Sequence, residues 1–293
     1  MSLPSSPTGS AWLPRLVVAP SFVLGFLFIY GFIAWNGWFS VSASRLLPNY
    51  EFAGFEPYVQ LFESDRFRVA LSNLAVFGTL FIGGAMAIGL LLAILLDQKI
   101  RAEGALRAVF LYPMALSMIV TGTAWKWILN PGLGVENLVQ GWGWTDFSFD
   151  WLVQPERAIY CVVIAGVWQS AGFVMALFLA GLRGIDDSII KAAQVDGASL
   201  PRIYWRILIP SLRPVFFSTL MVLSHLAIKS FDLVMALTAG GPGYATDLPA
   251  TFMYSMAFTR GQINLGAASA TVMLATIAAI VVPYLYSELR AKR

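Results

Sequence analysis

Long apolar stretches alternate with short polar segments along the whole chain. A helix of about 20 apolar residues crosses the hydrocarbon core of a bilayer, which is about 30 Å thick. Because lipid offers the backbone no hydrogen-bond partners, each such stretch is expected to be helical. The pattern therefore predicts an all-α, polytopic membrane protein with six transmembrane helices, at residues 16–35, 72–96, 106–129, 157–181, 211–237 and 265–286.

These stretches divide the chain into an N-terminal arm (1–15), one transmembrane domain (16–286) and a short tail (287–293). The arm is polar and precedes the first span without a small-residue cleavage site, so the first span is expected to be retained as a helix. No repeat of 20–50 residues is visible, which favours a single membrane domain.

Composition supports a membrane protein and excludes several other classes. The chain is 58% apolar and only 12% charged, whereas a soluble domain is about 25% charged. A single cysteine, Cys161, and a single histidine, His225, exclude an intrachain disulfide and a cysteine- or histidine-rich metal cluster. The net charge of +3 is too small and too dispersed to suggest a nucleic-acid partner.

The distribution of lysine and arginine predicts the orientation in the membrane. The arm, the tail and the segments 97–107 and 182–213 together carry twelve basic residues, and the loops on the other side carry five. Because cytoplasmic loops are enriched in lysine and arginine, both termini are expected in the cytoplasm.

The charged loop at 185–210 contains a pattern for two short helices. An acidic or hydroxyl side chain at 186–188 can cap the first helix at its N-terminus. Ala192 and Ala193 keep one face of this helix thin, and Gly197 permits the left-handed turn that ends it.

Ser199 is then expected to cap a second helix that tolerates Pro201 in its first turn and ends at Pro210. The two helices suggest a docking element for a partner, and a tight linker between two spans is the alternative.

Several sequence motifs, in the same order, resemble one family of transporters. The segment KAAQVDGA at 191–198 resembles the EAA loop of ABC-transporter permeases, above all those of maltose-type sugar importers. WQSAGF at 168–173 is similar to the fourth span of that family, and FD at 231–232 with LTAGGPG at 237–243 is similar to the end of its fifth. The resemblance covers most of the chain. Because a long outer domain is absent, the chain is closer to glucose/mannose-type permeases than to the maltose permease itself.

The resemblance implies a function and a set of partners. The chain would be the permease subunit of an ATP-driven, binding-protein-dependent sugar importer in the inner membrane of a bacterium. It would form half of the translocation pathway with a second, similar permease, and an extracytoplasmic sugar-binding protein would deliver the sugar. Two copies of a separate ATPase would bind ATP and magnesium, and this chain would bind no cofactor.

In that family the loop forms a coupling helix that sits in a cleft of the ATPase. The resemblance assigns this contact to Lys191, Ala192, Ala193, Asp196, Gly197 and Ala198. Lys191 departs from the family, which has a glutamate at this position. We hypothesise that the partner permease retains the glutamate and that this chain docks through shape and Asp196.

No phosphate-binding G-x-x-x-x-G-K-[ST] segment occurs in the sequence. The chain also lacks the H-E-x-x-H and G-x-S-x-G patterns of hydrolases. It is therefore not expected to be an enzyme, and its driving force must come from another subunit or an ion gradient.

Polar residues inside the spans are costly to insert and are candidates for function. His225, Lys229 and Asp232 are spaced to share one face of a continuous helix, with Lys229 and Asp232 close enough to pair. They would line a sugar pathway or, alternatively, fix helix packing by an ion pair.

Trp168 and Gln169 combine an aromatic face with an amide, which suits a pyranose, although helix packing also accounts for the tryptophan. The resemblance places the binding-protein contact at Gly240, Gly241, Pro242 and Gly243. Two other functions stay open: an ion-coupled secondary transporter that uses His225, Lys229 and Asp232 as a relay, and a scaffold without transport activity.

Overall fold

The computed structural model describes residues 12–98 and 100–291. The residues outside this description are 1–11 of the arm, Lys99, and the last two residues of the tail, which are Lys292 and Arg293. The described chain is all-α, and its β-structure is limited to an isolated bridge between Ser42 and Phe52. The predicted fold class is confirmed.

Four helices are long and apolar enough to cross a membrane by themselves. They include the predicted first, second, fourth and sixth spans, and each helix extends beyond the predicted limits at one or both ends. They are α1 (Trp12–Ser40), α3 (Asp65–Asp97), α7 (Ala158–Arg183) and α14 (Ile263–Ala291).

The predicted third span is broken into two helices. α4 (Glu103–Ala115) and α5 (Met118–Ile128) meet at an angle of 99°. Pro113 lacks a backbone donor near the end of α4, and Leu116 leaves the helix in an extended conformation. Ser117 then caps α5 by accepting a hydrogen bond from the backbone N–H of Val120 at 3.3 Å. One continuous helix over 106–129 was therefore the wrong prediction.

The predicted fifth span is also discontinuous. α11 (Arg213–Ile228) is followed by a break and then by the short helix α12 (Asp232–Leu237). Before α11, the helical segment Leu200–Ser211 is bent by 63° relative to it. By length and composition, the described residues include four spans, or up to six if each bent pair counts as one.

The remaining helices are short and connect these spans. Within Leu200–Ser211 the chain passes from α9 (Leu200–Ile203) through a π-helical turn, η2 (Tyr204–Leu208), to α10 (Ile209–Ser211). The others are α2 (Glu56–Glu63), α6 (Val135–Gly141), η1 (Trp151–Val153), α8 (Asp187–Val195), α13 (Pro249–Tyr254) and η3 (Ser255–Thr259).

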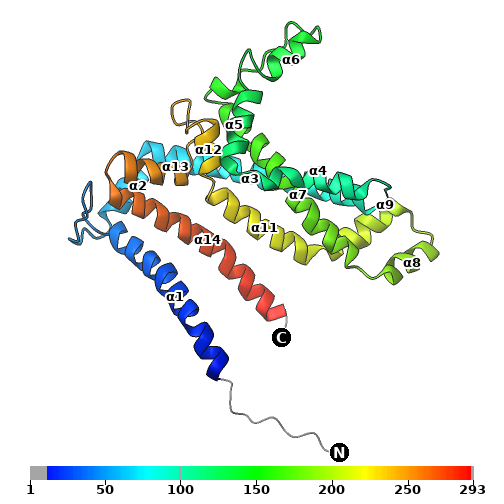
Figure 1. Ribbon diagram of the computed structural model, residues 1–293, viewed down its shortest axis with the longest axis horizontal. Coiled ribbons are helices and arrows are strands. Elements are labelled where there is room, and N and C mark those ends of the chain that lie inside the picture. The colour runs from blue at the N-terminus through cyan, green and yellow to red at the C-terminus, as the bar shows by residue number, and fades with distance from the viewer. Residues whose placement is uncertain (1–11, 99, 292–293) are drawn as a thin grey trace, which may run out of the picture.

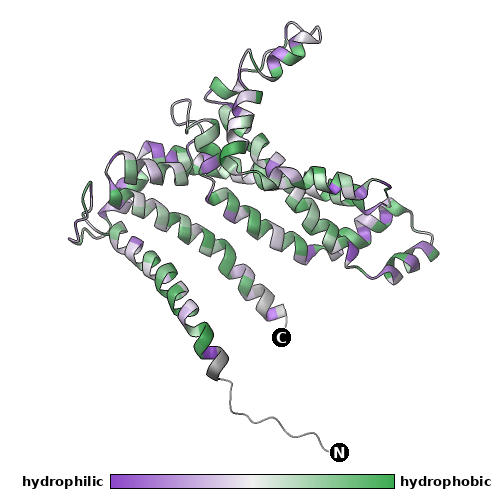
Figure 2. Ribbon diagram, viewed as in Figure 1, coloured by the Kyte–Doolittle hydropathy of each residue, from purple (hydrophilic) through white to green (hydrophobic). Residues whose placement is uncertain are grey.

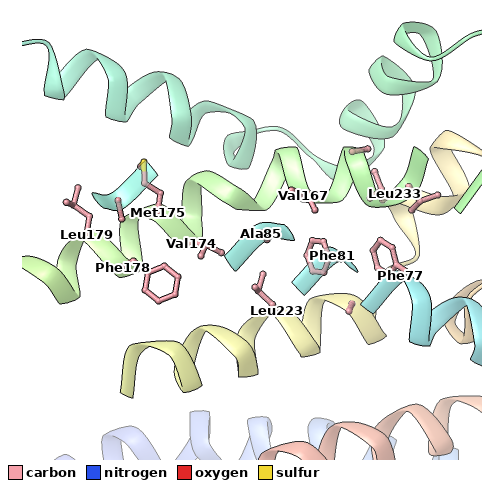
Figure 3. Packing of buried hydrophobic residues seen from close by; sticks show 14 of the residues in the cluster. Phe77, Phe81, Ala85, Val167, Val174, Met175, Phe178, Leu179, Leu223 and Leu233 are labelled. Carbon is pink, nitrogen blue, oxygen red and sulfur yellow. The ribbon is translucent and has the colours of Figure 1, made fainter. Parts of the chain in front are cut away.

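The main core lies where α3 and α7 pack together, with α11 against both. Figure 3 shows Phe77, Phe81 and Val174 in this layer, with Leu223 reaching it from α11. Because these side chains are fully or almost fully buried within one chain, the three helices form a single packed unit.

α1 stands apart from this core and lies beside α14 (Figure 1). Its side chains are largely exposed, and Asn36 binds it to α14 through a hydrogen bond from Nδ2 to Thr271 Oγ1 at 3.1 Å. Figure 2 shows that the long helices are mainly hydrophobic and that polar residues gather in α8 and the connecting segments. α8 and α13 lie at opposite ends of the molecule (Figure 1). We call these the α8 end and the α13 end.

Candidate functional site

The first helix of the 185–210 loop, α8, has a defined N-terminus. Of the three residues that could cap it, Asp186 does so: its carboxylate accepts a hydrogen bond from the backbone N–H of Ser188 at 2.8 Å. This hydrogen bond lowers the pKa of Asp186, because it stabilises the charged form. The cap therefore places a fixed negative charge at the positive end of the helix.

The C-terminus of α8 ends in the left-handed turn that the sequence predicts. Gly197 has φ +76°, and its N–H donates to the carbonyl of Gln194 at 3.0 Å. The N–H of Ala198 donates to the carbonyl of Ala193, also at 3.0 Å. This pair of hydrogen bonds is a Schellman motif, in which a residue without a Cβ is favoured at the left-handed position.

The outward surface of α8 and the turn after it carries apolar side chains. Val195 is 87% exposed, Leu200 53% and Ile189 47%, whereas Ala193 is buried against the rest of the chain. Lys191 and Asp196 are exposed and form no ion pair within the described residues. We call Ile189, Val195 and Leu200, with the adjacent Ala192 and Lys191, the docking surface.

The second helix of the loop differs from the prediction in two respects. Ser199 occupies the N-cap position of α9 and Pro201 lies in its first turn, but the Ser199 side chain makes no capping hydrogen bond. The helical path also continues past Pro210 and turns at Leu212, directly before α11.

The structure separates the three polar residues of the predicted fifth span. His225 is exposed on α11, Lys229 is the C-cap of that helix, and Asp232 is the first residue of α12. The break between the helices removes the shared face that a continuous helix would have given them. Lys229 and Asp232 are both exposed and do not form the predicted ion pair.

Trp168 and Gln169 lie on α7 but their side chains have different surroundings. Trp168 is exposed and packs edge-to-face on Trp125, with ring centroids 5.8 Å apart. Gln169 is buried, and its Nε2 donates to the carbonyl of Leu116 at 2.9 Å. That carbonyl has lost its helical partner at the break between α4 and α5, so the Gln169 amide stabilises the break.

A large apolar groove runs beside Trp168. Its volume is about 1000 Å³, and it is lined by α3, α4, α5 and α7. The lining is apolar and aromatic, with Trp125, Trp151, Tyr160 and Trp168 among its residues. A sugar needs hydrogen-bond partners as well as aromatic faces, so by itself this groove suits an apolar surface better than a sugar.

The glycine-rich segment at the α13 end is held by internal hydrogen bonds. Thr246 Oγ1 lies 2.7 Å from Thr238 Oγ1 and donates to the carbonyl of Gly241 at 2.9 Å. Gly240 has φ +87°, and a Cβ there would lie 2.9 Å from a carboxylate oxygen of Asp247. Gly243 is exposed, whereas Gly240 is buried and Gly241 and Pro242 are half-buried.

A buried ion pair braces this segment. Asp247 is 1% exposed, and its Oδ2 accepts a hydrogen bond from Arg66 Nε at 2.5 Å. Its other carboxylate oxygen accepts from Thr251 Oγ1 at 2.7 Å. The Arg66 guanidinium also donates to Ser255 Oγ at 2.9 Å and lies 4.5 Å from the ring centre of Tyr244. We call residues 238–248, with this ion pair, the braced loop.

No group of three histidine, cysteine or acidic side chains in the described part of the chain could hold a metal ion. The residues described above instead form the exposed surface of α8, an apolar groove and two helix breaks.

Comparison with known families now decides the class of the protein. The model of the family described as "Binding-protein-dependent transport system inner membrane component" matches residues 85–291. The chain belongs to this family.

Two relatives match the permease over nearly its whole length. The "Probable ABC transporter permease protein" of Pyrococcus horikoshii is 38% identical over 273 residues, which are 92% of this chain and 94% of the relative. The xylose/arabinose import permease protein of Haloferax volcanii is also 38% identical, over 91% of this chain and 85% of the relative.

A solved structure shares the fold of the permease. The crystal structure of a bacterial ABC transporter involved in the import of the acidic polysaccharide alginate gives a TM-score of 0.83 at 22% identity, covering 96% of both chains. The permease is thus the membrane-spanning, non-enzymatic subunit of an ABC importer. The comparisons give no support to an ion-coupled secondary transporter.

Sequence reasoning missed two features of the permease that the structure brings forward. The brace between Arg66 and Asp247 joins residues far apart in the sequence, and no local pattern predicts their contact. The break at Leu116 and Ser117 did leave a local signal, because Pro113 is followed after three residues by a serine that can cap a new helix.

Proposed function

We propose that the permease forms half of the pathway of an ATP-driven importer for sugar-like, polyhydroxylated solutes, and that α8 docks into a separate ATPase. The observation that carries this proposal is the docking surface. A short helix capped at both ends presents apolar side chains to solvent, which favours burial by another protein. ATP and magnesium would be held by that ATPase, since this chain has no phosphate-binding loop.

We infer that a second, similar permease completes the pathway. His225, Lys229 and Asp232 are exposed near the break after α11, where a partner could enclose them. Charged groups in a membrane are costly unless they are paired or line a polar cavity. In a polar pathway between two permeases they would supply donors and acceptors for hydroxyl groups. Trp168 would belong to the same pathway only where the partner adds polar groups to the groove. Gln169 is buried and does not line the groove, so it would support the pathway by holding the break between α4 and α5.

An extracytoplasmic binding protein is the third partner that we propose, with its contact at the braced loop. A related alginate importer has been solved in complex with a periplasmic protein that holds an alginate pentasaccharide. Gly243 and Tyr244 are exposed on the braced loop, at the end of the molecule away from α8. This placement suits a partner on the opposite side of the membrane from the ATPase.

The sugar-like substrate class rests on the names of relatives. One is a xylose/arabinose import permease, and another, from Pectobacterium atrosepticum, is an sn-glycerol-3-phosphate transport permease. With the charge bias of the loops, the proposal places both termini and α8 in the cytoplasm of an inner membrane. Lys191 is exposed on the docking surface, at the position where the family has a glutamate. Without that glutamate, docking of α8 would proceed through shape and through the nearby exposed Asp196.

Site-specific crosslinking in the native membrane tests the docking proposal. Cys161 is fully buried, so Val195→Cys adds the single accessible thiol, and Leu133→Cys supplies a matched thiol that is 78% exposed away from α8. A bifunctional thiol reagent should join Val195→Cys to a subunit that mass spectrometry identifies by its phosphate-binding sequence. Leu133→Cys should give no such product.

Transport assays separate the proposal from its rival. The complex purified in mild detergent and placed in liposomes should accumulate solute only with ATP. Uptake by this chain alone, driven by a proton or sodium gradient and indifferent to ATP, would overturn the proposal. Absence of any ATPase crosslink at position 195 would remove its main support.

A further inference from the structure

Two residues, one just before the 185–210 loop and one within it, contact the helix ends on either side of the short connection between α3 and α4. Where the loop leaves α7, Arg183 Nη2 lies 2.8 Å from Glu103 Oε1, at the first turn of α4. Where the loop returns, the Tyr204 hydroxyl donates to Asp97 Oδ2 at 2.5 Å, at the last residue of α3. We call these four residues the clamp.

The Tyr204 half of the clamp has the more specific geometry. The Tyr204 hydroxyl also accepts a hydrogen bond from Gln98 Nε2 at 2.6 Å, so both residues at the end of α3 bind it. Tyr204 is the first residue of the π-helical turn η2, and such turns occur frequently at functional sites. Its ring packs against the main core, which limits the positions that the hydroxyl can occupy.

The Glu103 half joins three charged groups. The same carboxylate oxygen of Glu103 that binds Arg183 also lies 2.7 Å from Arg107 Nη2, one turn further along α4. Glu103 and Arg107 are only partly exposed, so solvent screens their contact less than it would on an open surface, whereas Arg183 is exposed. The start of α4 is thereby held to the end of α7.

The chain connects the loop directly to α7 and α11 alone. A displacement of α8 would therefore reach α3 and α4 through side-chain contacts, which are the packing of the main core and, at the end of α3 and the start of α4, the clamp. Rigid-body movement of helices requires that the contacts between them hold while the whole unit turns. We propose that Tyr204 and Asp97, with Arg183 and Glu103, are positioning residues that transmit movement of the docked α8 to α3 and α4. This inference rests on the proposed coupling to an ATPase.

The consequence for transport follows from the path of the chain. α4 runs from the clamp to the break at Leu116, and α3 forms the main core with α7. With the clamp intact, the loop, α3 and α4 should turn as one body. Without it, the end of α3 and the start of α4 should lag behind the loop when the ATPase closes, while the rest of α3 stays packed on α7.

Distances between two spin labels test this directly in the complete complex. One label is placed on α9 at Arg202→Cys and the other on α4 at Gly104→Cys, both at exposed positions; buried Cys161 is left in place. Pulsed electron–electron double resonance is measured without nucleotide and after trapping with ATP and vanadate. With Tyr204 present, the distance between the labels should be the same in both states.

Tyr204→Phe removes one hydroxyl and keeps the ring. In this variant the distance between the labels should shift on trapping, and adding Arg183→Gln should enlarge the shift. Tyr286→Phe is the matched control, because Tyr286 is exposed on α14 and should leave the distance unchanged. Thermal unfolding should be similar for the four double-labelled proteins, namely the parent, Tyr204→Phe, Tyr204→Phe with Arg183→Gln, and Tyr286→Phe, which separates lost coupling from lost folding.

A second label pair, Arg202→Cys with Leu133→Cys, distinguishes failure of the proposed coupling from failure of the clamp inference. If this pair shows no response to ATP and vanadate with Tyr204 present, the proposed coupling itself is wrong. If it responds and Tyr204→Phe gives the same α9–α4 distances as the parent protein in both states, the clamp inference is overturned and the coupling stands.

Discussion

The docking surface and the braced loop lie at opposite ends of the permease and are stabilised in opposite ways. α8 is held by hydrogen bonds within its own few residues, at Asp186 and at Gly197, and its apolar side chains stay exposed. The braced loop is held by a buried ion pair that joins α3 to the segment before α13.

This difference shows which of the two ends depends for its shape on the rest of the chain. The structure of α8 is encoded locally, so its shape does not depend on residues far away in the sequence. The braced loop depends on Arg66, which is far away in the sequence, so its shape is tied to the packing of the whole α13 end.

Asp247→Ala should cause the largest loss of stability. It removes one partner of a buried ion pair and leaves the Arg66 guanidinium without its carboxylate. Breaking such a pair costs about 3–5 kcal/mol. Thermal unfolding of the purified permease should show a clear fall in midpoint.

Asp65→Ala is the matched control, because Asp65 and Arg68 form an ion pair that is largely exposed. Exposed pairs contribute about 0–1 kcal/mol, so this midpoint should hardly change. Equal losses in the two variants would show that the brace adds nothing beyond a surface contact.

Gly197→Ala should have an intermediate and local effect. A Cβ at φ +76° costs about 1–2 kcal/mol, and this cost falls on the C-terminus of α8. Hydrogen exchange of the α8 amides should accelerate, while exchange in the main core should stay the same.

Gly104→Ala should have the opposite effect and stabilise α4. Its added Cβ meets no atom within 4 Å, and alanine is the better helix former by about 1 kcal/mol. If exchange in the core accelerates along with α8 in Gly197→Ala, the helix is not the locally determined unit described above.

Lys191→Glu should have the smallest effect. Lys191 is exposed and makes no ion pair in the described chain, so reversing its charge removes no intramolecular contact. Co-purification of the ATPase and ATP-driven uptake should both persist at parental levels. A collapse of assembly would mean that the lysine makes a required contact with a partner.

Local patterns in the sequence predicted much of the fold. The four long helices follow from uninterrupted apolar stretches, because length and hydropathy suffice to define a span. The capped helix α8 also follows from its own residues, since Asp186 and Gly197 act on the backbone within one turn.

The breaks were harder to predict because apolar composition does not distinguish one long helix from two bent ones. At the third span the tertiary structure compensates for the broken hydrogen bonds with the Gln169 amide from α7. At the fifth span the break separates Lys229 from Asp232, and a helical-face argument that assumes continuity fails there.

Local patterns in the sequence were sufficient to show that the chain spans a membrane, where its four long helices lie and how α8 begins and ends. These properties depend on hydropathy and on hydrogen bonds between residues near one another in the chain. Tertiary packing was needed to determine the bends, the contact of Tyr204 with Asp97 in the clamp, and the ion pair of Arg66 with Asp247. Each depends on contacts between distant segments, which exist only after the helices have packed.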